Sequence, residues 1–411
     1  NIIDSPLSGI DPDEVIETPS IVNELNRYFE GNPAFSNLPR KFKIGITGSV
    51  NNAIHAEIQD LAFVPAVQVV EGCETIGFNI FVGGGLSASP VLAQQLDVFV
   101  RPEEVIQVAS AVASLFRDYG YREKRNHARL KFLLADWGVT KFTQELMALT
   151  GPLLPSVQSL TRSWNSSPYY GVQRQRQVGL NYLGLVIPGG ELTADELADL
   201  SRFANQYGDG TLRTTNSQNI ILPNIPDTAV SALLSETTVR RLFAPVHSAS
   251  ASAISCTGKQ FCPFGVAETK EWSRQITNYI DQHVELDMPV RVHVSGCVNS
   301  CGQNQIADIG LQGTLFQAGG QTQEGFSIWI GGQLGPNARL ATKLKGTVPT
   351  VRAAEIVTAF LEKYRSERYD QETFARFVDR QGVLWFQQSL DQWLQQNFNS
   401  IDPGLKEQPS A

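Results

Sequence analysis

Cys256-Thr-Gly-Lys-Gln-Phe-Cys262 and Cys297-Val-Asn-Ser-Cys301 are two short clips that hold four of the five cysteines of this chain. Thiolates are soft ligands that suit iron–sulfur clusters or zinc, so two such clips predict one metal centre. Structural zinc knuckles favour two to four residues between cysteines, and the first clip has five, which favours a cluster over zinc. Disulfides remain a third interpretation, although few cysteines in a long chain are more typical of a reducing compartment. We expect the metal ligands to be Cys256, Cys262, Cys297 and Cys301.

The composition is that of a globular protein. The chain has 411 residues, of which 42% are hydrophobic, and a net charge of −8. This length suits two or three domains, and the negative charge argues against a nucleic-acid-binding surface. The apolar run 61–70 contains Pro65 and Gln68 and is too short to cross a bilayer. We therefore expect a cytoplasmic protein without a membrane-spanning helix.

An internal repeat organises the chain. At an offset of 248 residues, without a gap, identical residues meet between 48–96 and 296–344, among them Gly48, Asn51, Ile58, Asp60, Gly83, Gly84, Leu86 and Leu92. Such a register indicates two copies of one domain, each of about 140 residues. The expected divisions are 1–150 for the first copy without a cluster, 151–178 for a linker, 179–245 for a small unit, and 246–400 for the second copy with the metal site.

Hydrophobic patterns predict alternating strands and helices in each copy. The predicted elements of the first copy are a helix over 20–29, strands over 42–46, 61–70 and 76–82, and a helix over 102–119. The second copy repeats this order through a strand over 326–330 and a helix over 353–364. The fold class is therefore α+β, built from duplicated α/β domains.

The small unit between the copies has no internal counterpart. Its pattern predicts a strand over 179–187, a helix over 193–208 with Thr193 as N-cap, and a strand pair over 211–223. The linker before it is rich in Pro, Ser, Gln and Arg, and little regular structure is expected there. A complete duplication would place a matching unit before residue 1, so we expect this first unit to be missing.

The two copies differ in their chemistry. The four cysteines align with Ser5, Asp11, Ser49 and Ala53, so only the second copy can hold a cluster. Conversely, Arg40, Arg129 and Lys131 align with Met288, Thr373 and Ala375. A metal in one half and cations in the other suggest an anion bound where the halves meet. The alternative is that these cations are solvated surface charges, and Arg129 and Lys131 would converge only if their segment is not helical.

Several segments carry a family resemblance. The first clip is followed by Glu268-Thr269-Lys270 and the second by Gly302-Gln303, and the chain also contains Leu38-Pro39-Arg40-Lys41-Phe42 and Gly179-Leu180-Asn181-Tyr182. Together these segments resemble ferredoxin-dependent assimilatory nitrite and sulfite reductases, and the resemblance covers essentially the whole chain. It implies that the units around the duplicated domains are ferredoxin-like, with residues 179–245 as the second of them.

The resemblance implies the cofactors and the site. They are a siroheme and a four-iron four-sulfur cluster (4Fe-4S), joined through the thiolate of Cys301. It implies that Arg40, Arg129 and Lys131 are catalytic cations and that Gln218 and Asn219 lie close to the siroheme. The implied reaction is the six-electron reduction of nitrite to ammonia. The implied partner is reduced ferredoxin, and we expect a monomer located in the cytoplasm, or in the plastid stroma of a photosynthetic eukaryote.

The substrate remains a choice between two anions. Cys301-Gly302-Gln303 and Thr257-Gly258 resemble nitrite reductases, whereas Lys131 resembles sulfite reductases, and we favour nitrite. Two other classes stay open: precorrin-3B synthase, an oxygen-dependent relative on the same scaffold, and a non-enzymatic iron–sulfur electron carrier.

Overall fold

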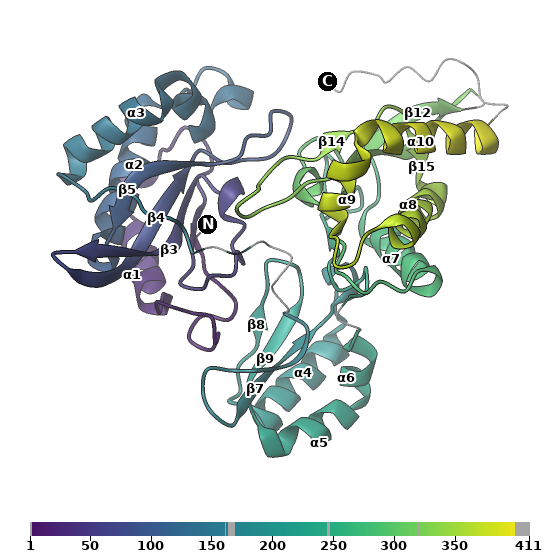
Figure 1. The fold of residues 1–411 in the computed structure, drawn as a ribbon, viewed down its shortest axis with the longest axis horizontal. Coiled ribbons are helices and arrows are strands. Elements are labelled where there is room, and N and C mark those ends of the chain that lie inside the picture. The colour runs from purple at the N-terminus through teal and green to yellow at the C-terminus, as the bar shows by residue number, and fades with distance from the viewer. Residues whose placement is uncertain (1, 161, 163–168, 245–246, 319, 399–411) are drawn as a thin grey trace.

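The computed structural model describes residues 2–160, 162, 169–244, 247–318 and 320–398. Figure 1 shows two similar sheet-and-helix halves side by side, with a smaller unit below them. No helix within these ranges is long and apolar enough to cross a membrane.

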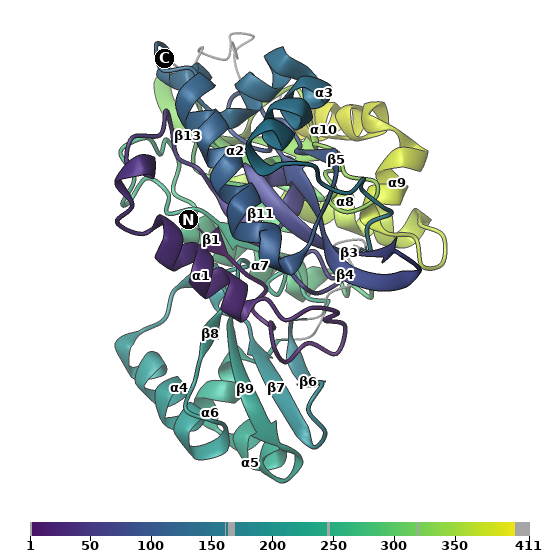
Figure 2. The ribbon, with the colours of Figure 1, turned by 90° about the vertical axis from the view of Figure 1, so that its left-hand side faces the viewer.

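The first half is a five-stranded sheet in the order β1-β2-β3-β4-β5. The first three strands run parallel, and β3, β4 and β5 are antiparallel. Their bounds are β1 (Ile2–Ile3), β2 (Ile44–Ile46), β3 (Leu61–Val70), β4 (Cys73–Val82) and β5 (Gln94–Val100). The helices are α1 (Pro19–Phe29), α2 (Val105–Tyr119) and α3 (Leu130–Thr150). They cover one face of the sheet, where Figure 2 shows α1 and α2 in front of the strands.

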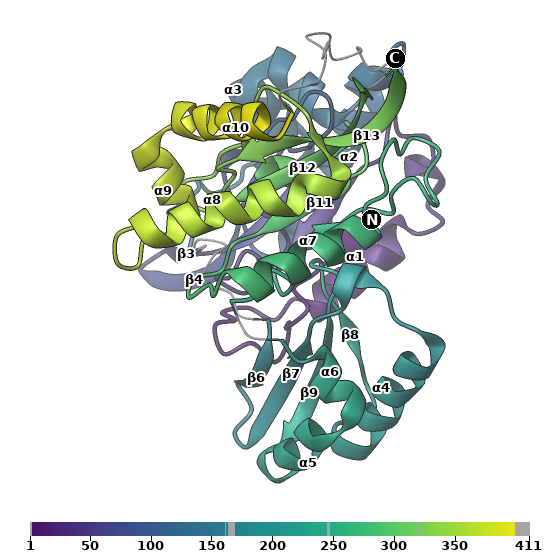
Figure 3. The same ribbon diagram turned by 90° about the vertical axis from the view of Figure 1, so that its right-hand side faces the viewer.

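The second half repeats this plan. Its sheet has the order β10-β11-β12-β13-β14, and β15 also pairs with β13. The bounds are β10 (Ile254–Ser255), β11 (Val292–Ser295), β12 (Ile309–Ala318), β13 (Gln321–Ile330), β14 (Thr342–Lys343) and β15 (Val348–Pro349). The helices are α7 (Lys270–His283), α8 (Ala353–Glu367), α9 (Phe374–Gln381) and α10 (Val383–Phe398). Figure 3 shows α7 and α8 lying over this sheet.

The register of the sheets confirms the duplication. Leu61 pairs with Val82 in the first half, and Ile309 pairs with Ile330 in the second, so both partners are displaced by the offset found in the sequence. The predicted strand over 61–70 is correct to the residue. The predicted strand over 76–82 begins three residues earlier, at Cys73.

The small unit is a four-stranded sheet in the order β6-β7-β9-β8. Its strands are β6 (Gly171–Arg174), β7 (Leu180–Leu185), β8 (Arg213–Thr214) and β9 (Ile220–Pro226), and its helices are α4 (Ala194–Tyr207), α5 (Val230–Ser235) and α6 (Thr237–Leu242). Thr193 caps α4 as predicted: its hydroxyl accepts from the Glu196 amide, and the Glu196 carboxylate accepts from the Thr193 amide. The prediction of an irregular linker is wrong at β6, whose amides pair with β7.

The halves meet through a contact that is itself duplicated. An apolar cluster joins Ile58, Leu86, Ile306 and Leu334, with Leu92 and Leu340 packed against it. Every member has its equivalent in the other half at the offset of 248. Such reciprocal contacts are the signature of a twofold axis, here within one chain.

Polar contacts across the interface obey the same symmetry. The Glu57 carboxylate accepts from the Gly335 amide at 2.6 Å, and the equivalent Gln305 side chain accepts from the Ser87 amide at 3.1 Å. His55 and Gln303, which are also equivalent, contact each other through Nδ1 and Oε1 at 2.8 Å. The relative placement of the two halves is therefore determined by matched polar and apolar pairs.

Candidate cluster and anion site

The four cysteines lie beyond the ends of two neighbouring parallel strands. Cys256 follows β10 and its amide donates to the Val294 carbonyl of β11, while Cys297 and Cys301 follow β11. The Gly296 amide in turn donates to the Cys256 sulfur at 3.1 Å. Because the carboxyl ends of parallel strands meet at one edge of a sheet, the fold brings both clips together.

Four thiols are a donor set that suits an iron–sulfur cluster. Burial raises the pKa of Cys297 and Cys301, and the neighbouring Cys256 and Cys262 thiolates raise it further, so all four sulfurs lie within electrostatic reach. A cubane cluster spreads its ligands because each cysteine binds a different iron. Its iron would also supply the positive charge that these crowded thiolates need.

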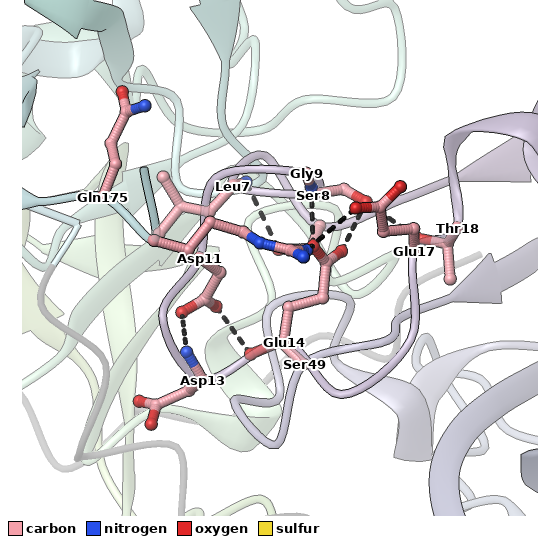
Figure 4. Close-up of polar contacts among 12 residues, drawn as sticks. Leu7, Ser8, Gly9, Asp11, Asp13, Glu14, Glu17, Thr18, Ser49 and Gln175 are labelled. Carbon is pink, nitrogen blue, oxygen red and sulfur yellow. Dashed lines mark hydrogen bonds and ion pairs between the residues drawn. The ribbon is translucent and has the colours of Figure 1, made fainter. Parts of the chain in front are cut away.

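The equivalent loop of the first half is closed by hydrogen bonds instead (Figure 4). The Ser49 hydroxyl donates to the Asp11 carboxylate at 2.6 Å, and these residues occupy the positions of Cys297 and Cys262. The second carboxylate oxygen of Asp11 accepts from the Asp13 amide at 2.9 Å. A side-chain hydrogen bond thus joins the same two loops that carry thiols in the second half.

Arg129 is held by a buried carboxylate. Its guanidinium donates to both oxygens of Asp60, at 2.8 and 2.9 Å through Nη2, and to the Gly84 carbonyl at 3.3 Å. Burial raises the pKa of Asp60, and the charge of Arg129 opposes this. In the second half, Arg291 makes the same contacts with Asp308 and Gly332.

The two arginines come from different elements. Arg291 lies next to β11, and its equivalent in the first half is Lys43, whereas Arg129 directly precedes α3. Because Arg129 already forms the ion pair with Asp60, the Lys43 ammonium forms a different hydrogen bond, to the Ile58 carbonyl at 2.9 Å. The lysine at position 43 and the pairing of Arg129 with Asp60 are therefore linked: the second compensates for the first.

The Lys131 side chain also forms structural hydrogen bonds. Its buried ammonium donates to the carbonyls of Gly85, Leu86 and Ser89 in the loop between β4 and β5. Burial lowers its pKa to about 8, and Arg129 adds to this effect. Arg129 and Lys131 do converge on one loop, because Arg129 has an extended backbone and the helix begins only at Leu130. Both side chains thus act on the turn over 83–89.

Two lysines that the sequence did not single out as site residues, Lys41 and Lys43, interact electrostatically with Cys301. Burial lowers the pKa of Lys43 to about 8, while the Asp60 and Cys301 charges raise it. The charge of Lys41 in turn lowers the pKa of the Cys301 thiol. Arg40 lies beside them, and burial and then the charges of Arg125 and Arg129 lower its pKa. The signal in the sequence was the replacement of Arg291 by Lys43 at equivalent positions.

Gln218 and Asn219 support the first clip from the small unit. Gln218 has a left-handed backbone with φ +63°, and its side chain exchanges two hydrogen bonds with the Ser255 backbone, at 2.7 and 2.9 Å. Ser255 directly precedes Cys256. Asn219 accepts from the Ile187 amide at 2.8 Å and donates to the Ala251 carbonyl at 3.3 Å. The pair therefore ties the small unit to the strand that leads into the cluster loop.

Comparisons with known proteins agree with this architecture. The model of the nitrite and sulphite reductase 4Fe-4S domain matches residues 1–151 and 248–398, and that of the nitrite/sulfite reductase ferredoxin-like half domain matches residues 173–238. The ferredoxin–nitrite reductase of Synechococcus elongatus is 41% identical over 84% of this chain and 67% of its own length. A ferredoxin sulfite reductase of Mycolicibacterium paratuberculosis is 34% identical over 92% of this chain and 68% of its own.

A solved structure shows the same fold. The Mycobacterium tuberculosis NirA protein superposes with a TM-score of 0.86 at 33% identity, over 92% of this chain and 70% of that one. The chain thus spans about two thirds of the length of these relatives. Matches to both halves and to the unit between them leave one assignment: the chain belongs to the nitrite and sulphite reductase 4Fe-4S family.

Proposed function

We propose that the protein reduces nitrite to ammonia, taking six electrons one at a time from reduced ferredoxin. One observation carries the proposal: Cys301 of the second half interacts electrostatically with Lys41 and Lys43 of the first half. An anion bound between them would meet both a source of electrons and a source of protons. The curated relative from Synechococcus, named ferredoxin–nitrite reductase, supports nitrite over sulfite.

The cofactors divide between the halves. We assign the 4Fe-4S cluster to Cys256, Cys262, Cys297 and Cys301. Cys301 is the thiolate that we propose to be shared with a siroheme, which when bound would supply an iron able to bind the anion and deliver electrons to it. Cys301 suits this position because it is the most exposed of the four cysteines, although its thiol is still partly buried.

The cations of the first half bind the anion and supply protons. Lys43, with a pKa lowered to about 8, is charged at neutral pH and yet gives up its proton more readily than an ordinary lysine. Lys41 and Arg40 add positive charge that stabilises an anion in a partly water-excluded site. Arg129 and Lys131, predicted as catalytic from the sequence, are proposed to act through Asp60 and the loop over 83–89 rather than by touching the substrate.

Sulfite reduction to sulfide is the second candidate. The cation cluster would serve either anion, and a relative of similar coverage is a sulfite reductase. Precorrin-3B synthase and a simple electron carrier are the remaining alternatives. We also propose that the protein acts as a monomer, in the cytoplasm or plastid stroma.

The test is direct. Full-length protein, purified without oxygen, should show siroheme absorbance with about four non-haem irons per chain. With reduced ferredoxin it should form ammonia from nitrite faster than sulfide from sulfite. Zinc without a chromophore would refute the cofactors, and faster sulfide formation would reverse the choice of substrate.

A further inference from the structure

Cys301 lies on a tight turn that ends at Gln303. The Gln303 amide donates to the Ser300 carbonyl at 2.9 Å and closes the turn. Ser300 and Gln303 both have left-handed backbones, with φ +53° and +61°, which residues other than glycine rarely adopt. Strain of this kind persists only where the surrounding contacts enforce it. The contacts of Gln303 therefore decide where the turn holds Cys301.

The Gln303 side chain crosses to the first half of the molecule. Its Oε1 lies 2.8 Å from Nδ1 of His55, and because an amide oxygen only accepts, His55 is the donor. His55 is 2% exposed and also has a left-handed backbone, with φ +51°. The end of the Cys301 turn is thus tied by a buried hydrogen bond to the half that carries the cations.

The Gln303 carbonyl is held by a second imidazole. His293, fully buried on β11, donates from Nδ1 to this carbonyl at 3.2 Å. Burial lowers the pKa of both histidines to about 3, so each ring is neutral at physiological pH and has a single N–H to donate. The amide, the carbonyl and the side chain of Gln303 are therefore each bonded, to the turn, to β11 and to the other half.

The cluster-free half has the same turn without the second imidazole. Its turn ends at His55, whose amide donates to the Asn52 carbonyl at 3.3 Å. Gly45 stands at the position of His293. The side chain that reaches the His55 carbonyl is Gln59, through a long contact of 3.5 Å. The imidazole that holds the turn from β11 is thus particular to the half with the cysteines.

Two smaller residues make room for that imidazole. In the first half, a Cβ added at Gly45 would lie 3.0 Å from Cδ1 of Ile54 and 3.2 Å from Cγ of Gln59. In the second half, the equivalents of Ile54 and Gln59 are Gly302 and Ala307. Three positions therefore differ together, and their joint effect is to replace packed side chains by a hydrogen-bond donor behind the Cys301 turn.

We propose that Gln303 is a positioning residue for Cys301: with its side chain held by His55 and its carbonyl by His293, it fixes the thiol relative to both halves. Partners that orient a metal ligand strengthen its binding, because the ligand has less freedom to lose. The inference rests on the cluster of the proposed function and is independent of which anion is reduced.

The test compares variants of the full-length, cofactor-loaded protein. Gln303→Met removes the side-chain acceptor at nearly constant size, and His293→Leu removes the donor on β11. His55→Ala removes the other donor, whereas His55→Asn keeps an N–H near the place of Nδ1 and tolerates the left-handed backbone. Thr277→Val is the matched control, because it removes a buried hydroxyl of the same half that donates to the Ser273 carbonyl at 2.9 Å. The readouts are the rate of iron loss to a chelator and the width of the electron paramagnetic resonance lines of the reduced cluster.

Gln303→Met, His293→Leu and His55→Ala should each lose iron about tenfold faster than the parent and broaden the resonance lines, because the turn then occupies several positions. His55→Asn should stay close to the parent. Adding His55→Ala to Gln303→Met should change neither readout further, since both remove the same hydrogen bond. Thr277→Val should unfold at a lower urea concentration and yet match the parent in both readouts, which separates position from stability.

Parental iron loss and line width in Gln303→Met and His293→Leu would overturn the inference, as would equal effects in Thr277→Val. Failure of His55→Asn to recover what His55→Ala loses would also contradict it. A parent protein without iron would instead refute the cluster of the proposed function, and this inference with it.

Discussion

Lys43 combines two properties at the scale of a single residue: a charge at neutral pH and a proton that burial has made easier to release. Its pKa of about 8, compared with the usual 10.5, comes chiefly from burial. It is also the position at which the two halves exchange a lysine for an arginine. The ion pair that replaces the arginine, Arg129 with Asp60, could not be predicted from the sequence, because the two residues are 69 positions apart.

Replacement of Lys43 by Gln should lower kcat/KM for nitrite by about 100-fold, because it removes both a charge and a proton donor. In the parent protein, activity should fall as pH rises through about 8. Steady-state rates between pH 6 and 10 check both expectations. Lys345→Gln, at an exposed position, is the control for loss of one positive charge.

This loss of activity should not come from unfolding. Between pH 8 and 10.5 the unfolded chain binds more protons than the folded one at Lys43 and Lys131, since both folded pKa values are lowered. These groups therefore make the free energy of unfolding rise with pH in that window. Parallel loss of activity and of stability would contradict the assignment.

The cysteines give a second prediction at this scale. Cys301→Ser should separate the siroheme from the cluster and abolish nitrite reduction, because no other exposed thiol of the second half can replace the bridge. Cys73→Ser should leave both cofactors in place, since Cys73 is exposed at the start of β4, on the tip of the β3–β4 hairpin. Absorbance spectra and iron content distinguish the two, and equal loss in both variants would refute the bridge.

At the scale of elements, the loop over 4–18 connects the first half with the small unit. Arg213 donates to the Pro6 and Ser8 carbonyls, and the Asp4 carboxylate accepts from the Thr18 hydroxyl at 2.8 Å. Burial raises the pKa of Asp4 to about 6, and the nearby charge of Glu14 adds to it. At neutral pH the Asp4 carboxylate is therefore ionised, although burial disfavours its charge.

Between about pH 4 and 6 the folded protein binds more protons at Asp4 than the unfolded chain does, so its stability should fall as pH rises through this window. Asp4→Asn should flatten this dependence and stabilise the protein at pH 7 by roughly 1 to 3 kcal/mol. Urea unfolding at pH 4.5 and 7 measures the change. An Asn variant that is less stable than the parent at pH 7 would show that the ionised form is preferred.

Elements also mark the limit of prediction from sequence. The repeat predicted the correspondence between the two halves, and the paired strands β3–β4 and β12–β13 keep it, because identical apolar and glycine positions constrain both pairs. It did not indicate that the equivalent of β5 is broken into β14 and β15, since short edge strands depend on which backbone groups find partners. Nor did composition indicate β6, which forms only because β7 offers a free edge.

At the scale of the whole molecule, the site depends on how the halves are joined. Leu334 is fully buried in the apolar cluster between them. Leu334→Ala should therefore lower the free energy of unfolding by about 2 to 5 kcal/mol through the cavity it leaves. Urea denaturation checks this, with Leu384→Ala, 69% exposed on α10, as the control. Equal stability of the two variants would mean that the interface contributes little.

The exchange of Arg291 for Lys43, with Arg129 taking over the buried carboxylate, also constrains how such a protein can change. Removing Arg129 alone would leave Asp60 buried without its partner, at a cost of about 3 to 5 kcal/mol. Restoring arginine at position 43 alone would place two guanidinium groups beside one carboxylate. Neither single step is favourable, so the two halves can become alike again only by changing both positions together. The division of labour between them is thus protected by the fold itself, whatever anion the site reduces.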